Sequence, residues 1–237
     1  MNHKRLFRYI THPEWVTEFL QGRLYCNGLH TFQTIEDENV RGDQYEGIGL
    51  HRPQDGLQIN NLTTGKSFIL PGYQFESSLA AKQINILCLS NIKSELLACR
   101  FGAQACIEIV EPKAFCDLAS AGLPNGYELP NVEGRNRIGH KVRYYDLNSP
   151  PANLWALPEL LAISKKMEFS WQDEFRLVFG KKGSFEFESA QLQLNQSGLV
   201  ARSSAQVPDP QILELGDISH ICKVYRFDPK ERKFLSD

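Results

Sequence analysis

Long hydrophobic runs are absent from this sequence. None of its apolar stretches approaches the roughly 18–20 consecutive residues that a membrane-spanning helix needs. The N-terminal stretch MNHKRLFRYITHPEW contains no apolar core, so a secretory signal is not expected. We therefore expect a cytoplasmic protein that has no membrane partner.

Motifs of the common metal and phosphate sites are also missing. The six cysteines form no C-x-x-C pair, and the six histidines show no H-E-x-x-H spacing, which disfavours a zinc site. The segment NNLTTGKS lacks the leading glycine and the preceding apolar strand of a P-loop. We expect no metal cofactor, and we interpret the cysteines as reduced thiols. A nucleophilic role for Cys99 is disfavoured because no histidine base lies close in sequence.

An excess of charge of either sign is absent, with 26 Lys and Arg against 28 Asp and Glu. The 237 residues carry a formal net charge of −2, with 42% hydrophobic and 23% charged side chains. This balance is ordinary for a globular protein and gives no general attraction to nucleic acid or to anionic membranes.

Regular alternation of strands and helices is missing as well, which argues against a doubly wound parallel sheet. Strand-like segments outnumber the short helical ones, so we predict an α+β fold in a single domain over residues 1–237, with a mixed or mostly antiparallel sheet. Turn-rich segments between about residues 50 and 75 predict a hairpin or loop insertion. A short helix after Pro13 is expected to pack Trp15 and Phe19 onto the sheet.

The segment SWQDEFRLVFG, residues 170–180, combines the alternation of a half-buried strand with a polar face. We predict a central or near-central strand around residues 171–179. Phe169, just before it, Trp171, Phe175, Leu177 and Phe179 are expected to point to its apolar face, which Asp173 interrupts. The opposite face carries Gln172, Glu174 and Arg176. That face is either a solvent-exposed surface with a Glu174–Arg176 pair, worth about 0–1 kcal/mol, or the wall of a cleft.

Four segments, in order LFRYI…W…FLQGRLYCN, INILCLSN, ACIEI and WQDEFRLVF, resemble the motifs of a widespread prokaryotic domain family of unknown function. Its members typically open with an aromatic-basic-Tyr strand, continue through hCfS and GvcIeF strands, and later show Y-E-x-E-Y-R-L. The resemblance covers nearly the whole chain. This sequence departs from the pattern where EDENVRGDQYEG replaces N-D-P-F-E and where Gln172 replaces the first Glu of E-x-E.

The order of these motifs is also similar to that of ADP-ribosyltransferase-like folds. Those folds place a basic residue on the first strand, a serine on a middle strand and a glutamate within E-x-E or Q-x-E on a later strand. The resemblance implies NAD as the substrate, Arg8 and Ser90 as cofactor-binding residues, and Gln172 and Glu174 as catalytic residues. It also implies an unknown protein or nucleic-acid acceptor and a role as a bacterial toxin or a phage-defence effector.

The chemistry of NAD cleavage fits these residue types. Breaking the nicotinamide–ribose bond develops positive charge on the sugar carbon, which a carboxylate such as Glu174 stabilises. Gln172 could orient an acceptor, and Arg8 could clamp a diphosphate. Simpler roles are also open, because Arg8 could pack over a neighbouring aromatic ring and Ser90 could end a strand at a turn.

Acidic residues are concentrated in a loop, residues 36–46, which contains Glu36, Asp37, Glu38, Asp43 and Glu46 around Arg41 and Gly42. Oxygen-rich clusters hold Mg²⁺ in phosphodiester chemistry. The spacing matches no ligand code, however, and solvated charge is the simpler interpretation. In the family resemblance this segment is a substrate-facing loop, so Tyr45 is a further candidate for cofactor binding.

Three functions therefore remain open from the sequence. The first is an NAD-consuming transferase or glycohydrolase, and the second is a non-catalytic sensing or interaction module of the same fold. The third is a metal-dependent nuclease that uses the acidic loop.

Overall fold

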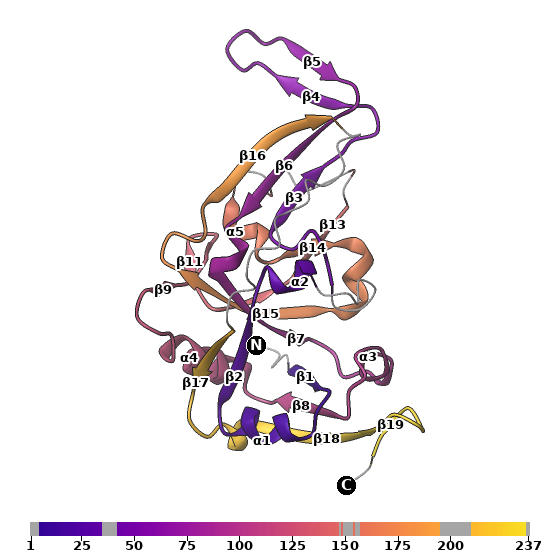
Figure 1. Cartoon of the computed structure of the whole chain (residues 1–237), viewed down its shortest axis with the longest axis vertical. Helices are drawn as coiled ribbons and strands as arrows, with labels where there is room; N and C mark the ends of the chain where they lie inside the picture. Colours follow the sequence, from indigo (N-terminus) through magenta and orange to yellow (C-terminus); the bar gives the residue numbers. More distant parts are fainter. Residues whose placement is uncertain are drawn as a thin grey trace.

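A computed structural model describes residues 5–34, 42–146, 148, 154, 157–194 and 210–235. The largest β-sheet lies in the lower half of the molecule as drawn in Figure 1. Its strands run in the order β12 (Gly139–Lys141), β15 (Glu174–Lys181), β7 (Ile84–Ser90), β1 (Leu6–Ile10), β8 (Ala105–Ile109), β18 (Cys222–Asp228) and β19 (Lys233–Phe234). Three further strands branch from this order. They are β2 (Arg23–Gly28), which pairs with β7, β17 (Gln211–Glu214), which pairs with β2, and β9 (Tyr127–Glu128), which pairs with β15.

Strands β7 and β15 are buried on both faces. They pair antiparallel over seven residue pairs, from Glu174 opposite Ser90 to Gly180 opposite Ile84. Leu87 of β7 belongs to one hydrophobic core, while Ile86 belongs to a second core on the other side of the sheet. The largely apolar segment INILCLS follows from this double burial, because both faces of the strand pack against other side chains.

Helices cover the first core. Helix α1 (Glu14–Leu20) and helix α4 (Pro112–Ala121) each contribute a buried phenylalanine, Phe19 and Phe115, whose ring centroids lie 6.0 Å apart. Phe19 packs as the sequence predicts. The prediction for Trp15 is wrong, because its side chain is 50% exposed.

A second, three-stranded sheet rises above the first and carries an arm. Its strands run in the order β16 (Phe187–Leu194), β6 (Tyr73–Leu79) and β3 (Ile48–His51). A hairpin of β4 (Leu57–Asn60) and β5 (Ser67–Leu70) projects from its end, at the top of Figure 1. The predicted insertion at residues 50–75 thus contains this hairpin together with parts of two strands of the second sheet.

The remaining elements are short. Two small strand pairs are β10 (Asn131–Val132) with β11 (Arg135–Asn136) and β13 (Arg143–Tyr145) with β14 (Ser164–Lys166). The other helices are α2 (Thr31–Thr34), α3 (Glu95–Arg100), α5 (Pro158–Leu161) and the 3₁₀ helices η1 (Ala81–Gln83), η2 (Met167–Gln172) and η3 (Ser219–Ile221). The fold is α+β with mostly antiparallel strands and few helices, as predicted. No helix in the described part of the chain is long and apolar enough to cross a membrane.

The strand predicted over residues 171–179 begins later than expected. Residues Met167–Gln172 form η2, and Asp173 adopts a left-handed conformation with φ 39° before β15 starts at Glu174. The alternation that the sequence predicts is confirmed from Glu174 onward, where Leu177 lies in the first core. It is wrong for Trp171, which is only partly buried and stacks with the Arg100 guanidinium 4.4 Å from its ring centre.

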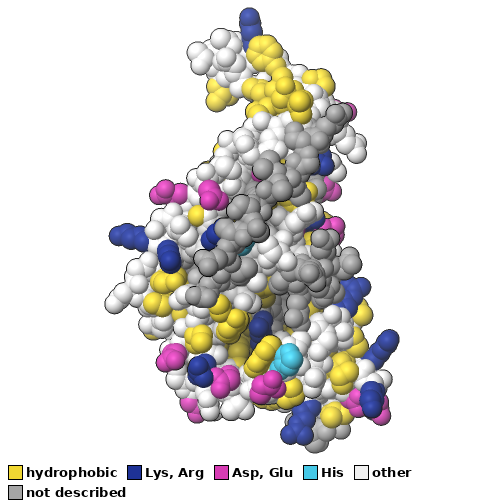
Figure 2. Space-filling model, in the orientation of Figure 1, with side chains coloured by type: hydrophobic (Ala, Val, Ile, Leu, Met, Phe, Trp, Pro, Cys, Tyr) yellow, Lys and Arg dark blue, Asp and Glu magenta, His cyan; other side chains and the backbone are white. Residues whose placement is uncertain are grey.

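We expect the projecting hairpin to contribute little to the stability of the protein. Its residues 58–69 are all exposed, and hydrophobic side chains gather on it in Figure 2. Replacing residues 58–69 by Asn-Gly should change the free energy of unfolding by less than about 1 kcal/mol in urea denaturation, because exposed residues contribute little. Leu57→Ala, at the buried base of the hairpin, should instead cost about 2–5 kcal/mol. A large loss in the shortened variant would show that the arm supports the body.

Candidate functional site

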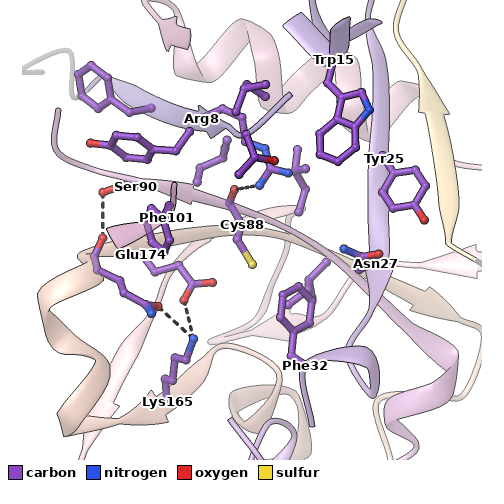
Figure 3. A pocket seen from close by; sticks show the side chains of 18 residues that line it. Arg8, Trp15, Tyr25, Asn27, Phe32, Cys88, Ser90, Phe101, Lys165 and Glu174 are labelled. Carbon is purple, nitrogen blue, oxygen red and sulfur yellow. Dashed lines mark hydrogen bonds and ion pairs between the residues drawn. The ribbon is translucent and has the colours of Figure 1, made fainter. Parts of the chain in front are cut away.

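A pocket opens where strand β7 changes partners. On one edge β7 pairs with β1 only at Ser90 opposite Phe7, and with β2 only at Ile86 and Asn85. Between these points the two partner strands diverge, and the Cys88 carbonyl instead accepts a hydrogen bond of 2.7 Å from Nη1 of Arg8. The split in the sheet therefore creates a hollow that Arg8 crosses (Figure 3).

The pocket brings together four of the five residues that the sequence singles out. Arg8, Ser90, Gln172 and Glu174 all line it, although they come from β1, β7, η2 and β15. Its volume is about 170 Å³, and a cavity of about 150 Å³ is known to hold one benzene ring. The hollow therefore has room for about one aromatic ring.

Tyr45 does not line this pocket. Its ring lies 4.6 Å from Nζ of Lys166, outside the hollow. The sequence prediction of a direct cofactor contact for Tyr45 has no support in this geometry. Glu36, Asp37, Glu38 and Arg41 of the acidic loop lie outside the described residues.

Glu174 belongs to a buried network of four charged side chains. Arg176 donates from Nε to Oε1 of Glu174 at 2.6 Å, and from Nη1 and Nη2 to the two carboxylate oxygens of Glu46 at 2.8 and 2.6 Å. Lys165 lies 3.4 Å from both carboxylates. The exposed fractions are 0% for Arg176 and Glu46 and 3–4% for Glu174 and Lys165. Of the two alternatives that the sequence left open, the solvent-exposed Glu174–Arg176 pair is therefore wrong.

The network is electrically balanced, with two carboxylates and two cations. Burial by itself raises the pKa of Glu174, but the charges of Arg176 and Lys165 outweigh it and hold that pKa below the usual range. Burial lowers the pKa of Lys165, whereas Glu174 and Glu46 raise it, with a net increase. Glu174 is therefore an ionised carboxylate and Lys165 an ammonium at neutral pH.

Ser90 and Gln172 hold the wall of the pocket. The Ser90 hydroxyl donates to the Gln172 carbonyl at 2.9 Å and accepts from the Ile92 amide at 3.3 Å, which is the strand-ending turn considered from the sequence. The Gln172 side-chain oxygen accepts a hydrogen bond of 3.0 Å from Lys165. Because Gln172 lies on η2, it does not share the face of a strand with Glu174 as predicted. Ser90 thus fixes the backbone at Gln172, and the Gln172 side chain positions Lys165 next to Glu174.

The outer half of the pocket is aromatic, and sequence reasoning missed it. Trp15 of α1, Tyr25 and Asn27 of β2, and Phe32 of α2 lie on one side of Arg8 in Figure 3, and Ser90, Glu174 and Lys165 lie on the other. The alternation of apolar and polar residues along β2 could have indicated it. Leu24 and Cys26 are buried in the core, so Tyr25 and Asn27 must point away from it.

The carboxylates of the acidic loop that the structure describes face cations of the protein. Glu46 is held by Arg176, and Asp43 lies 3.9 Å from Lys166. Among the described residues, no group of three or more His, Cys, Asp or Glu side chains is placed to hold a metal ion. Because the Glu46 carboxylate is already bound by Arg176, it gives no support to the hypothesis of a metal-dependent nuclease.

Asp43 predicts a pH effect on stability. Burial, and then the nearby charge of Glu46, raise its pKa from 3.8 to about 6. The folded state therefore binds a proton at the Asp43 carboxyl more tightly than the unfolded state does. The stability that this protonation contributes is lost as the pH rises from about 4 through 6. Relative to Asp43→Asn, the wild type should lose at most about 3 kcal/mol of unfolding free energy over this window, with no further change above it. Urea titrations of both proteins at several pH values measure this, and a constant difference would contradict the prediction.

Comparisons of the chain with family models, with curated proteins and with solved structures found no match. Both resemblances noted from the sequence therefore remain predictions, and the function is argued from the pocket.

Proposed function

We propose that the pocket binds NAD and that the protein cleaves its nicotinamide–ribose bond, as a glycohydrolase or as an ADP-ribosyltransferase. The observation that carries this proposal is the convergence of Arg8, Gln172 and Glu174 on one hollow, whose volume of about 170 Å³ has room for about one ring. An ionised carboxylate, a guanidinium and aromatic side chains are the groups that an oxocarbenium-forming nucleotide reaction uses.

Each group has a role in the proposed reaction. The ribose carbon–nitrogen bond breaks, nicotinamide leaves with the bonding electron pair, and positive charge develops on the sugar carbon. Glu174 stabilises that charge from the inner wall. Water or an acceptor nucleophile then bonds to the carbon and loses a proton, while Arg8 binds the diphosphate.

The inner wall is also rigid. Glu174 begins a strand that is buried on both sides, and its carboxylate is fixed by Arg176 and Lys165. A carboxylate fixed in this way needs no reorganisation when positive charge develops next to it. Its own charge is partly balanced by the two cations, however, so the electrostatic stabilisation is smaller than that of an unpaired carboxylate.

This balance favours a second candidate, a non-catalytic module that binds a nucleotide and does not cleave it. Both Glu174 oxygens accept hydrogen bonds from Arg176, at 2.6 and 3.3 Å, and the Ser90 hydroxyl is used by the backbone. The two candidates share the ligand and differ in turnover.

Incubation of the purified protein with NAD distinguishes them. The first candidate predicts release of nicotinamide, measured by chromatography, either with water alone or after addition of candidate protein or nucleic-acid acceptors. Saturable NAD binding without nicotinamide release, under all these conditions, supports the second candidate. Absence of both binding and release rejects the NAD proposal.

The proposed cellular setting is the cytoplasm, where NAD is available to such an enzyme. The six cysteines are free in the structure, which fits a reducing compartment. A role as a toxin or a phage-defence effector remains part of the proposal, since uncontrolled NAD consumption would harm a cell.

A further inference from the structure

Two large aromatic side chains at the mouth of the pocket are half exposed. Trp15 is 50% exposed and Tyr25 is 53% exposed, and both line the same pocket as Arg8. Single exposed aromatic residues are common on protein surfaces, but two that line one pocket both offer an apolar ring face to the same ligand. Flat apolar surfaces of this kind stack on nucleobases.

The fold holds these rings in place. Tyr25 points toward the pocket because its neighbours Leu24 and Cys26 on β2 are buried in the core. Trp15 stands in the first turn of α1, and its ring packs against His12 with a centroid distance of 4.3 Å. A held aromatic side chain loses little conformational entropy when a ring stacks on it.

Asn27 adds a polar group to the same side of the pocket. It lies two residues after Tyr25 on β2, so both side chains leave the strand on the same face. Within the described part of the chain, no hydrogen-bond partner is found for the Asn27 side chain. A carboxamide offers one acceptor and two donors, and this pattern matches the N6 amino group and the N7 acceptor of adenine.

We propose that Trp15, Tyr25 and Asn27 form an adenine-binding subsite. The base lies against the two aromatic rings, and the Asn27 carboxamide accepts a hydrogen bond from N6 and donates one to N7. This inference rests on the proposed function, because adenine is one end of NAD. It also predicts something further, that adenine nucleotides without nicotinamide bind this protein.

The position of Arg8 supports the assignment. In Figure 3 Arg8 lies between the aromatic side, with Trp15 and Tyr25, and the inner side, with Glu174. A ligand that spans the two sides would bring its middle to the guanidinium. In a dinucleotide the middle is the diphosphate, which guanidinium groups bind well.

Titration calorimetry with ADP and IDP tests the subsite directly. IDP carries an oxygen in place of the N6 amino group, so the wild type should bind ADP about tenfold more tightly. Asn27→Ala should remove this preference while still binding both nucleotides. Because a ratio is compared within each protein, a general change in folding does not imitate the result.

Variants of the rings provide the second measurement. Trp15→Ala and Tyr25→Ala should each weaken ADP binding by about tenfold or more. Phe68→Ala is the matched control, since Phe68 is 54% exposed on the distant hairpin and does not line the pocket. Its ADP affinity should equal that of the wild type.

The outcomes separate this inference from the proposed function. ADP binding that depends on Trp15 and Asn27, without nicotinamide release from NAD, keeps the subsite and rejects the NAD-cleaving activity. NAD cleavage with an unchanged KM in Trp15→Ala and equal affinities for ADP and IDP keeps the activity and rejects the subsite. Binding of single-stranded DNA but not of ADP also rejects it.

Discussion

Arg176→Ala is expected to lower the free energy of unfolding by about 3–5 kcal/mol, which could prevent folding at physiological temperature. Arg176 is fully buried and donates to Glu46, to Glu174 and to the Ala162 carbonyl. Its removal leaves two buried carboxylates with Lys165 as their common cation. Urea denaturation followed by circular dichroism measures the loss.

Two further variants show whether charge balance is the cause. Arg143→Ala removes an arginine whose side chain is 38% exposed in its ion pair with Glu133, so it should cost only about 0–1 kcal/mol. The double variant Glu46→Gln with Arg176→Met restores neutrality around Glu174 and Lys165, and it should recover part of the loss. An Arg176→Ala protein as stable as Arg143→Ala would contradict the importance of this network.

Glu174→Gln is expected to reduce nicotinamide release from NAD by about a hundredfold or more, because the neutral amide does not stabilise positive charge on the sugar carbon. The substitution is nearly isosteric, but it also leaves a buried cation without its full complement of negative charge. Some stability is therefore lost together with activity. The assay needs a control with the same structural cost.

Glu46→Gln supplies that control. Glu46 contacts the same two cations at similar distances, with hydrogen bonds from Arg176 and a 3.4 Å separation from Lys165, but it does not line the pocket. Both variants should lose similar stability in urea, while only Glu174→Gln should lose most of its turnover. Equal losses of turnover in the two folded variants would make Glu174 a structural residue.

Two strands of the large sheet could be predicted from local sequence patterns. The apolar run INILCLS and the alternation from Glu174 to Phe179 reflect contacts that repeat along one strand, so β7 and β15 could be predicted as buried strands. The residue at which β15 starts, Glu174, could not be predicted in this way. Alternation extends back to Trp171 with Asp173 as its interruption, and the sequence alone does not show that Asp173 takes a left-handed conformation after a 3₁₀ helix.

The sequence by itself determined the α+β class and singled out polar residues that line one pocket, including Arg8 and Glu174. Only the tertiary structure decided their environment. Glu46 reaches Arg176 across 130 positions of sequence, and whether a carboxylate lies in water or among buried cations depends on such distant partners. The split between β1 and β2 likewise arises from how two separate segments share one edge of β7, and local sequence patterns do not encode that arrangement.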